Sequence, residues 1–258
     1  MKIAAIIPVF NHEEPVAQVV AALRRHGLPV VLVDDGSAPV CARALDMLAS
    51  DNAKGPPLVL LRHTENQGKG AAVMTGLAYL ASARGRSALG CEEGFSHALQ
   101  IDADGQHDTA ALPEFLRAAA AYPEAVIVGT PQYGADIPKR RLYGRYLTHL
   151  WVWINTLSFR IADSMCGFRV YPLAATLPLL PILKHARRMS FDTEILVRLD
   201  WQNTPVVSLA VRVRYPENGR SHFRALEDNL WIAAMHARLF LGMLSRSPGL
   251  VRRWFQKK

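Results

Sequence analysis

Two carboxylates lie one residue apart in the run 100–107, whose letters are QIDADGQH. Asp102 and Asp104 follow a short apolar segment that is typical of a buried strand, so both can address one ion at its end. Mg2+ and Mn2+ prefer such oxygen ligands and keep coordination positions for phosphate oxygens. Taken alone, the pair is better explained as an acidic turn before the helix expected near Thr109. Its context in the chain favours the metal site.

Two further polar runs follow predicted strands. Val33–Ser37 (VDDGS) comes directly after the second strand, where a carboxylate can bond ribose hydroxyls or a base edge. A turn with a helix cap explains this run equally well. Asn66–Gly70 (NQGKG) opens a helix, where glycines and the helix N-terminus favour an anion. The run lacks the spacing of a P-loop and is a weak signal by itself.

Short apolar runs alternate with helical patterns through the first half of the chain. We expect strands at Ile3–Val9, Val30–Val33, Leu58–Leu61, Ala98–Ile101 and Ala125–Val128. We expect helices at Pro15–Arg25, Val40–Leu48, Gly70–Ala83 and Ala111–Ala121, and a loop at Ser82–Ser96. This alternation indicates an α/β fold with a doubly wound, mainly parallel sheet, which binds ligands at the strand ends where the polar runs lie.

The second half has longer helices that carry aromatic and basic residues. Helices are expected at Arg140–Phe159, Phe191–Trp201 and Leu226–Leu244, with a strand at Val206–Val213 between the last two. No linker separates the halves, so we expect one domain over residues 1–223. Residues 224–258 form a helical, basic and aromatic tail that packs on the domain or lies at a membrane surface.

Composition limits the partners and the compartment. The formal net charge of +8 suits an anionic partner, such as phospholipid headgroups or a phosphorylated substrate. Nucleic acid is a poor candidate, because no recognisable reading motif accompanies the basic residues. The three cysteines are far apart, which indicates a reducing compartment. No apolar stretch reaches the roughly 20 residues of a spanning helix, and the start does not resemble a signal peptide. We therefore expect a soluble or peripheral protein.

Seven runs, in this order, resemble family 2 glycosyltransferases, and in particular their dolichol-phosphate mannose synthase-like branch. After Pro8–Asn11 (PVFN) come the VDDGS, NQGKG and DADGQH runs. They are followed by Asp163–Arg169 (DSMCGFR), and the last two elements of the branch are matched by Phe191–Glu194 (FDTE) and Asn218–Phe223 (NGRSHF). The resemblance covers roughly residues 3 to 223, and the ordered set makes chance agreement very small.

The resemblance implies a GT-A fold and transfer of a sugar from a nucleotide diphosphate to a lipid-linked acceptor such as polyprenyl phosphate, with a divalent metal and with inversion. The implied metal is Mg2+ or Mn2+, held by Asp102, Asp104 and Gln106. The implied nucleotide-sugar site comprises these three residues with Pro8, Phe10, Asn11, Val33, Asp35, Lys69 and Ala103.

The sequence departs from the family pattern at three places. His12 stands where the family often has an acidic residue, and Glu13 follows it. The run Gly129–Gln132 (GTPQ) lacks an arginine expected beside phosphate, and His222 replaces the usual lysine. The chemistry stays plausible, but the donor sugar and the acceptor are left open.

Arginines and carboxylates in the second half supply the remaining candidates. An acceptor phosphate could be bound by Arg169, Arg220 and His222, or by Arg212 and Arg214, since guanidinium groups bind phosphate in a forked geometry. A solvated surface role is equally consistent with each arginine. The base candidates are Asp163, Asp192 and Glu194, although an acceptor phosphate is already anionic and needs little help from a base. We assign no role to His107, His185 or His236.

The tail combines aromatic side chains, such as Trp231 and Trp254, with several arginines and lysines. Such a helix suits the anionic inner face of a cytoplasmic membrane, although a core helix with a basic end explains it nearly as well. Two other functions stay open. A nucleotidyltransferase would need a glycine-rich basic loop where PVFN stands. A non-catalytic nucleotide-sugar or lipid-binding module would tolerate loss of Asp102 and Asp104.

Overall fold

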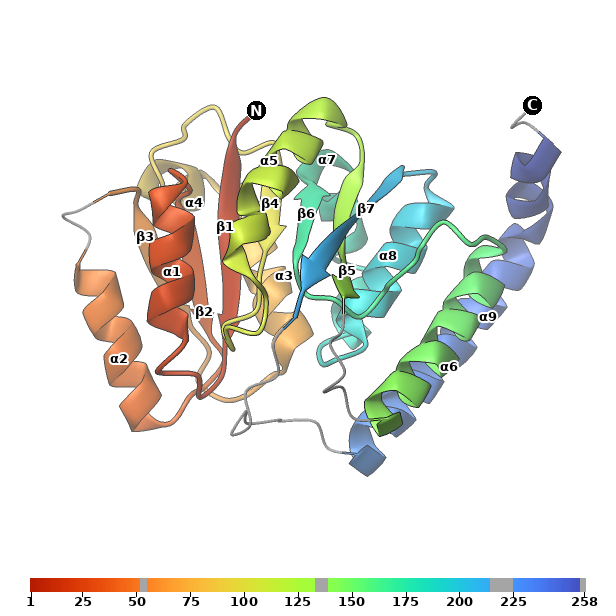
Figure 1. Cartoon of the computed structure of the whole chain (residues 1–258), viewed down its shortest axis with the longest axis horizontal. Helices are drawn as coiled ribbons and strands as arrows, with labels where there is room; N and C mark the ends of the chain where they lie inside the picture. Colours follow the sequence, from red (N-terminus) through yellow and green to blue (C-terminus); the bar gives the residue numbers. More distant parts are fainter. Residues whose placement is uncertain (52–54, 133–138, 214–224, 256–258) are drawn as a thin grey trace.

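A single mixed sheet forms the centre of the molecule (Figure 1). The computed structural model describes residues 1–258 except 52–54, 133–138, 214–224 and 256–258. Among the described residues seven strands pair in the order β3-β2-β1-β4-β6-β5-β7. Their bounds are β1 Ile3–Val9, β2 Val30–Asp34, β3 Leu58–Arg62, β4 His97–Gln100, β5 Val126–Gln132, β6 Arg169–Pro172 and β7 Val206–Arg212.

The sheet is mainly parallel, as predicted. β1 pairs in parallel with β2 and β4, and β5 pairs in parallel with β7. Strand β6 runs antiparallel to both of its neighbours, β4 and β5. Every residue of β1 and of β2 is buried, because helices cover both faces of the sheet. This burial explains why these strands appear in the sequence as continuous apolar runs.

Helices form a layer on each face. On one face α1 (Val16–Arg25), α2 (Pro39–Ser50) and α5 (Leu112–Ala121) contribute apolar side chains to a shared core. On the other face α3 (Lys69–Ala81) and α8 (Phe191–Trp201) contribute to a second core. This arrangement is the doubly wound architecture that the alternating pattern predicts.

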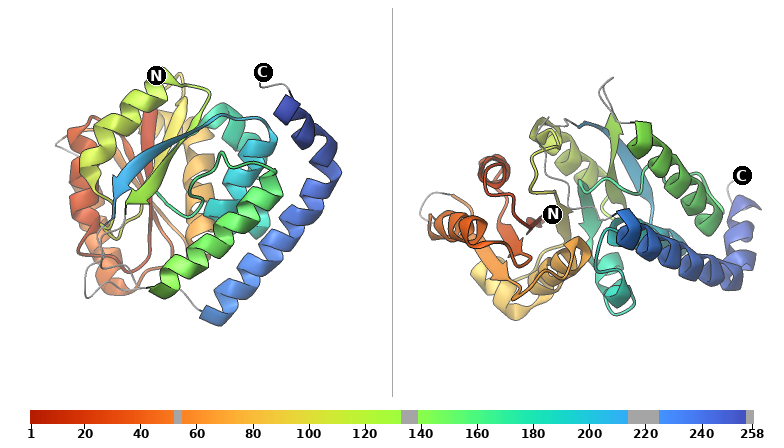
Figure 2. Two further views of the ribbon diagram at one scale, coloured as in Figure 1. Left: turned by 45° about the vertical axis from the view of Figure 1, so that its right-hand side comes forward. Right: turned by 90° about the horizontal axis from the view of Figure 1, so that it is seen from below.

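Two long helices pack outside α8, as Figure 2 shows. They are α6 (Lys139–Thr156) and α9 (Ala225–Phe255). Met235 and Leu239 of α9 are fully buried in the second core. Within the described residues, no helix is both long and apolar enough to cross a membrane. The predicted boundary at residue 223 lies outside the described residues, so the division into residues 1–223 and 224–258 stays a prediction.

Three elements differ from the sequence-based expectation. The segment expected as a loop, 82–96, contains the short helix α4 (Ala83–Ala88), whose first turn is capped by the hydroxyl of Ser82. Helix α9 continues past Leu244 and through Pro248 to Phe255, because Leu250 is buried and Arg253 pairs with a buried carboxylate of α8. Strand β6 was not expected. The short helices α7 (Leu173–Thr176), η1 (Thr109–Ala111), η2 (Leu177–Leu179) and η3 (Leu183–His185) complete the fold.

Candidate active site

The predicted polar runs meet at one edge of the sheet. Parallel strands β1, β2 and β4 end at this edge, with β2 on one side of β1 and β4 on the other. Ligands of doubly wound sheets bind at such a switch point, where the chain leaves neighbouring strands in opposite directions. The VDDGS run covers the last two residues of β2 and the turn after it, DADGQH begins two residues after the end of β4, and NQGKG leads into α3.

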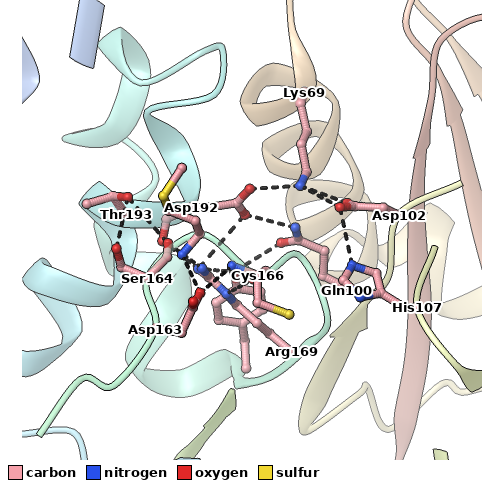
Figure 3. Close-up of polar contacts among 12 residues, drawn as sticks. Lys69, Gln100, Asp102, His107, Asp163, Ser164, Cys166, Arg169, Asp192 and Thr193 are labelled. Atoms are coloured by element: carbon pink, nitrogen blue, oxygen red, sulfur yellow. Dashed lines mark hydrogen bonds and ion pairs between the residues drawn. The ribbon is translucent and has the colours of Figure 1, made fainter. Parts of the chain in front are cut away.

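Asp102 stands at the centre of a charged cluster (Figure 3). The ammonium of Lys69 lies 2.7 Å from Asp102 Oδ1 and 2.8 Å from Asp192 Oδ2, so one cation bridges two carboxylates. His107 Nε2 lies 3.5 Å from Asp102 Oδ2. Lys69 is the first residue of α3, whose start thereby places this charge beside the end of β4.

The contacts within this cluster keep both the Lys69 ammonium and the Asp102 carboxylate charged. Burial alone would lower the pKa of Lys69, but the facing carboxylates of Asp102 and Asp192 outweigh it and raise that pKa above its ordinary value. Burial likewise tends to raise the pKa of Asp102, but Lys69 and His107 hold this pKa well below its usual range. Asp102 is therefore an anion at neutral pH and can ligate a cation.

Asp104 has a different environment from Asp102. Burial and the charge of Asp102 raise the pKa of Asp104, while the backbone N–H of Gln106 donates to its Oδ1 at 3.0 Å. Among the described residues, no group of three or more His, Cys, Asp or Glu side chains could hold a metal alone. Two neighbouring carboxylates with the half-buried Gln106 fit an ion that takes its remaining ligands from a substrate diphosphate.

Asp192 belongs to a buried network behind Lys69. Its Oδ1 accepts from Gln100 Nε2 at 2.9 Å, and Gln100 Oε1 accepts from the hydroxyl of Tyr171 at 3.0 Å. Arg169 then donates to that hydroxyl and to the backbone oxygen of Asp192. Predicted as a base, Asp192 thus lies next to Asp102, and both of its oxygens have donors within the protein.

Arg169 does not lie where an acceptor phosphate could reach it. Its side chain is 0% exposed, and its guanidinium also donates to the backbone oxygens of Cys166 and Ser164. We therefore correct its assignment from acceptor binding to positioning, since it fixes the segment beside Asp192. Arg212, in contrast, is exposed at the end of β7. Arg214, Arg220 and His222 lie outside the described residues.

Asp163 and Glu194 are structural partners rather than bases. Asp163 receives two hydrogen bonds from Arg145, at 2.7 and 2.9 Å, and one each from the backbone N–H groups of Met165 and Cys166. Its pKa is lowered because His149 and Arg145 outweigh the effect of burial. Glu194 of α8 pairs with arginines of α8 and α9, Arg198 and Arg238. We therefore no longer expect either carboxylate to take a proton during a reaction.

Two of the residues predicted to bind the nucleotide, Asp35 and Asn11, connect neighbouring loops at this edge of the sheet. Asp35 accepts from the backbone N–H groups of Gln67 at 2.9 Å and Gly68 at 2.8 Å, and lies 2.7 Å from His63 Nδ1. Asn11, in a left-handed conformation with φ of 56°, accepts from Ala38 N at 2.7 Å. These side chains join the loops after β1, β2 and β3 into one surface.

Three other predicted nucleotide residues have buried side chains. Val33 packs in the core under α3 and Ala103 in the opposite core, while Pro8 is buried within β1. Only the backbone of Val33 and Ala103 is left to face a ligand, and their place in the nucleotide-sugar site stays a prediction. Phe10 is half-buried next to Asn11, at the same edge of the sheet.

Sequence analysis missed two residues that contact Asp102. His107 was treated as ordinary, although it follows the carboxylate pair within the same run. Gly167 was seen only as part of DSMCGFR, yet a Cβ at this position would lie 2.4 Å from both carboxylate oxygens of Asp102. Proximity in the sequence could have indicated His107. The approach of Gly167 depends on pairing between β4 and β6 and has no local signal.

Comparison with known structures identifies the fold as that of GT-A glycosyltransferases. Glucosyl-3-phosphoglycerate synthase of Mycobacterium tuberculosis superposes with a TM-score of 0.61 at 13% identity, over 95% of this chain and 80% of that one. TarS of S. aureus, residues 1–349 in complex with UDP-GlcNAc, gives 0.59 at 16% identity, over 93% and 66%. At these identities the similarity concerns the fold.

Sequence comparison then gives the family. Residues 4–176 match the model of glycosyl transferase family 2, and the chain belongs to this family of enzymes. It is 26% identical to dolichyl-phosphate beta-glucosyltransferase of Dictyostelium discoideum, over 70% of this chain and 54% of that protein. It is 24% identical to the UDP-N-acetylglucosamine–dolichyl-phosphate N-acetylglucosaminyltransferase of Methanococcus voltae, over 82% and 85%. The chain thus spans about half of the first relative and most of the second.

Proposed function

We propose that the protein transfers a sugar from a nucleotide diphosphate donor to a polyprenyl or dolichyl phosphate, with inversion and with Mg2+ or Mn2+. The observation that carries the proposal is the cluster of Asp102, Lys69 and Asp192 at the carboxyl end of β4, with Asp104 two residues further on. The named relatives are transferases with dolichyl phosphate in their names, which supports this acceptor class.

In this proposal Asp102, Asp104 and Gln106 would hold the metal, which would neutralise charge on the departing nucleoside diphosphate. A crystal structure of the M. tuberculosis synthase contains Mn2+ and uridine-diphosphate-glucose, which supports such an ion in this fold. Lys69 holds the Asp102 carboxylate in place and keeps it ionised. The nucleoside would bind to the loop before α3 and to the neighbouring loops, which the buried Asp35 and the half-buried Asn11 hold together.

The acceptor chemistry agrees with the state of the three predicted bases, each of which has partners among the described residues. Of the three candidates, Asp163 and Glu194 are held in ion pairs with arginines, and Asp192 is held by Lys69 and Gln100. A phosphate acceptor attacks as an anion and needs no proton removed at neutral pH. A hydroxyl acceptor would need a positioned carboxylate, so the arrangement favours phosphate. We also propose that the protein works at the inner face of the cytoplasmic membrane, on its anionic surface.

The test is sugar transfer to polyprenyl phosphate across a panel of nucleotide sugars, with Mn2+, with Mg2+ and with EDTA. We expect Asp102→Asn and Asp104→Asn each to lower turnover by at least about 100-fold, because charge on the leaving group would lose its stabilisation. Asp108→Asn is the matched control, since Asp108 lies in the same loop and caps η1 through Ala110 N. Near-normal turnover by either site variant would exclude the proposed metal site, and release of pyrophosphate would indicate a nucleotidyltransferase.

A further inference from the structure

A pocket of about 440 Å3 lies next to the start of α3 and is lined in part by Gln67, in the loop before this helix. Four of its lining residues are basic and come from η3 and from the segment that joins η3 to α8. Of two further polar residues, one lies in the same segment and the other in the loop before α3. An aromatic residue of α9 forms the remaining wall. The lining residues are Lys184, His185, Arg187, Arg188, Ser190, Gln67 and Trp231.

The position of this basic segment is fixed by its backbone. The oxygen of Arg187 accepts from Ala71 N, in the first turn of α3, at 2.7 Å. A Cβ at Gly68 or Gly70 would lie within 3.0 Å of the same segment, so α3 approaches it as closely as glycines allow. The backbone that carries the basic side chains is therefore held in place next to the candidate active site. The side chains themselves are not part of the Asp102 cluster.

The four basic side chains have no acidic partner. Among the described residues, no ion pair joins any of them to a carboxylate, whereas Lys69 and Arg145 both have one. Lys184, His185 and Arg187 are exposed, and Arg188 is half-buried. Concentrated positive charge without compensating carboxylates attracts an anion, and guanidinium groups bind phosphate with two parallel hydrogen bonds.

The aromatic wall connects the pocket to an apolar surface. Trp231 is 51% exposed and Leu230 next to it is 71% exposed. Further along α9, Leu241 and Leu244 are also exposed. Tryptophan with basic neighbours is typical of the membrane interface, where the ring lies at headgroup depth. A soluble phosphate would gain nothing from these apolar neighbours.

We propose that this pocket binds the phosphate headgroup of a membrane lipid, whose chains lie against Trp231 and the exposed side of α9. The pocket shares Gln67 with the loop proposed to bind the nucleoside, but none of its basic side chains belongs to the Asp102 cluster. Its occupation by a lipid headgroup does not require the proposed transfer reaction. It would hold the active edge at the bilayer, where a lipid-linked acceptor is found.

The test measures binding of the full chain to phosphatidylcholine vesicles containing phosphatidic acid, without nucleotide or metal. Lys184→Gln with Arg187→Gln removes two charges from the pocket. Because each basic residue near an anionic surface strengthens binding to it, the loss of both predicts a roughly 30-fold weaker affinity for the vesicles. Arg25→Gln with Arg43→Gln removes two exposed charges from α1 and α2. This charge-matched control should stay within about threefold of the wild type. Equal losses in both double variants would overturn the pocket in favour of diffuse attraction.

Two further measurements keep the proposal open to refutation. Lys184→Gln alone should bind vesicles about fivefold more weakly, and the exposed position of this residue makes misfolding a poor explanation. Trp231→Ala should weaken vesicle binding but leave the binding of inorganic phosphate, followed by calorimetry, unchanged. If the pocket variants lose inorganic phosphate but bind vesicles normally, the site takes a soluble phosphate and the lipid assignment is wrong. Because no donor is present, a failed transfer assay and a failed vesicle assay are independent results.

Discussion

At the residue scale, the chemistry depends on how Asp102 is held. Lys69 fixes it from α3, His107 lies within reach of Oδ2, and the backbone of Gly167 lies against both oxygens. Three separate chain segments therefore converge on one carboxylate. Such convergence gives the carboxylate a fixed orientation before any ligand binds, which is the condition for electrostatic catalysis.

We expect Gly167→Ala to lower transfer activity by at least about tenfold while the protein remains folded, because the added Cβ would displace the Asp102 carboxylate. Displacement by a few tenths of an ångström cannot relieve a contact of 2.4 Å. The control is Gly144→Ala in α6, where a Cβ would have nothing within 4 Å. It should preserve activity, and its greater helix propensity should raise stability by up to about 1 kcal/mol. Equal activity of the two variants would show that Gly167 does not constrain Asp102.

The sequence predicts which residues surround this site better than it predicts their roles. Asp102, Asp104 and Lys69 meet as expected because each follows a strand or starts a helix at the same edge. Asp163 pairs with Arg145, 18 positions away, and Arg169 donates to backbone oxygens. Glu194 pairs with Arg238, 44 positions away, as well as with Arg198 on the next turn of α8. A single sequence without an alignment carries no signal for such pairs, so these groups could not be distinguished from acid–base or phosphate-binding candidates.

At the scale of elements, the attachment of α9 decides whether the tail is core or accessory. Leu239 of α9 is fully buried between the helices, whereas Leu241 two residues on is 67% exposed. Arg238 reaches Glu194 of α8 at 3.2 Å, and Arg253 reaches Asp200 at 3.1 Å. The helix thus contributes both apolar and charged contacts to the main body.

We expect Leu239→Ala to lower the free energy of unfolding by about 2–5 kcal/mol, because it leaves a cavity in the second core. Leu241→Ala makes the same chemical change on the exposed side and should change it by less than about 0.5 kcal/mol. Urea denaturation followed by circular dichroism measures both. Similar stability of the two variants would mean that α9 is not part of the cooperative fold, and that residues 1–223 form the structural unit.

A pH dependence follows from the contact between α6 and α9. His236 is buried beside Asn155, and burial lowers its pKa from 6.5 to about 4. A proton binds more readily to the unfolded chain than the folded one, so this group supports stability above pH 6.5 and loses that contribution as the pH falls from 6.5 towards 4. Asp102 and Asp163, whose pKa values are lowered, lose their contributions only below about pH 4.

The expected result is a melting temperature that falls between pH 6.5 and 4 in the wild type and falls less in His236→Gln. His26→Gln is the control, since His26 is exposed at the end of α1. Thermal denaturation at matched ionic strength gives the two slopes. If His236→Gln and the wild type lose stability in parallel over this interval, His236 is not the group that titrates.

Element prediction succeeded where one strong periodic signal extends over a whole element. The five strands expected in the first half are all present. The first has the expected ends, and the other four differ by one to four residues at one or both ends. Strand β6 has four residues and ends at Pro172, so its only support is pairing with β4 and β5, which lie far away in sequence. Helix α9 passes through Pro248 because its last turns are held by tertiary contacts, which override the local preference of proline.

At the scale of the whole molecule, an apolar surface lies on the two helices that pack outside α8, the helix that carries Asp192. Helices α6 and α9 run side by side beyond α8, as both views of Figure 2 show. Large exposed apolar side chains gather on them, including Tyr146, Leu147 and Leu150 of α6 and Leu241 and Leu244 of α9. Exposed apolar side chains concentrated on neighbouring helices indicate an interaction surface, and the proposed lipid-linked acceptor would make a bilayer its partner.

We expect Leu241→Gln with Leu244→Gln to reduce binding to anionic vesicles by roughly tenfold or more, because two apolar side chains would no longer enter the interface. Val40→Gln with Met47→Gln makes a comparable change on α2, where both residues are exposed, and should leave binding unchanged. Co-sedimentation should be repeated at high salt, which screens exposed charges over a shorter distance. Salt should weaken binding of the wild type without abolishing it, since the apolar part resists screening. Complete release by salt together with equal binding of the two double variants would mean that charge alone holds the protein to the membrane, and that the α6–α9 surface has another partner.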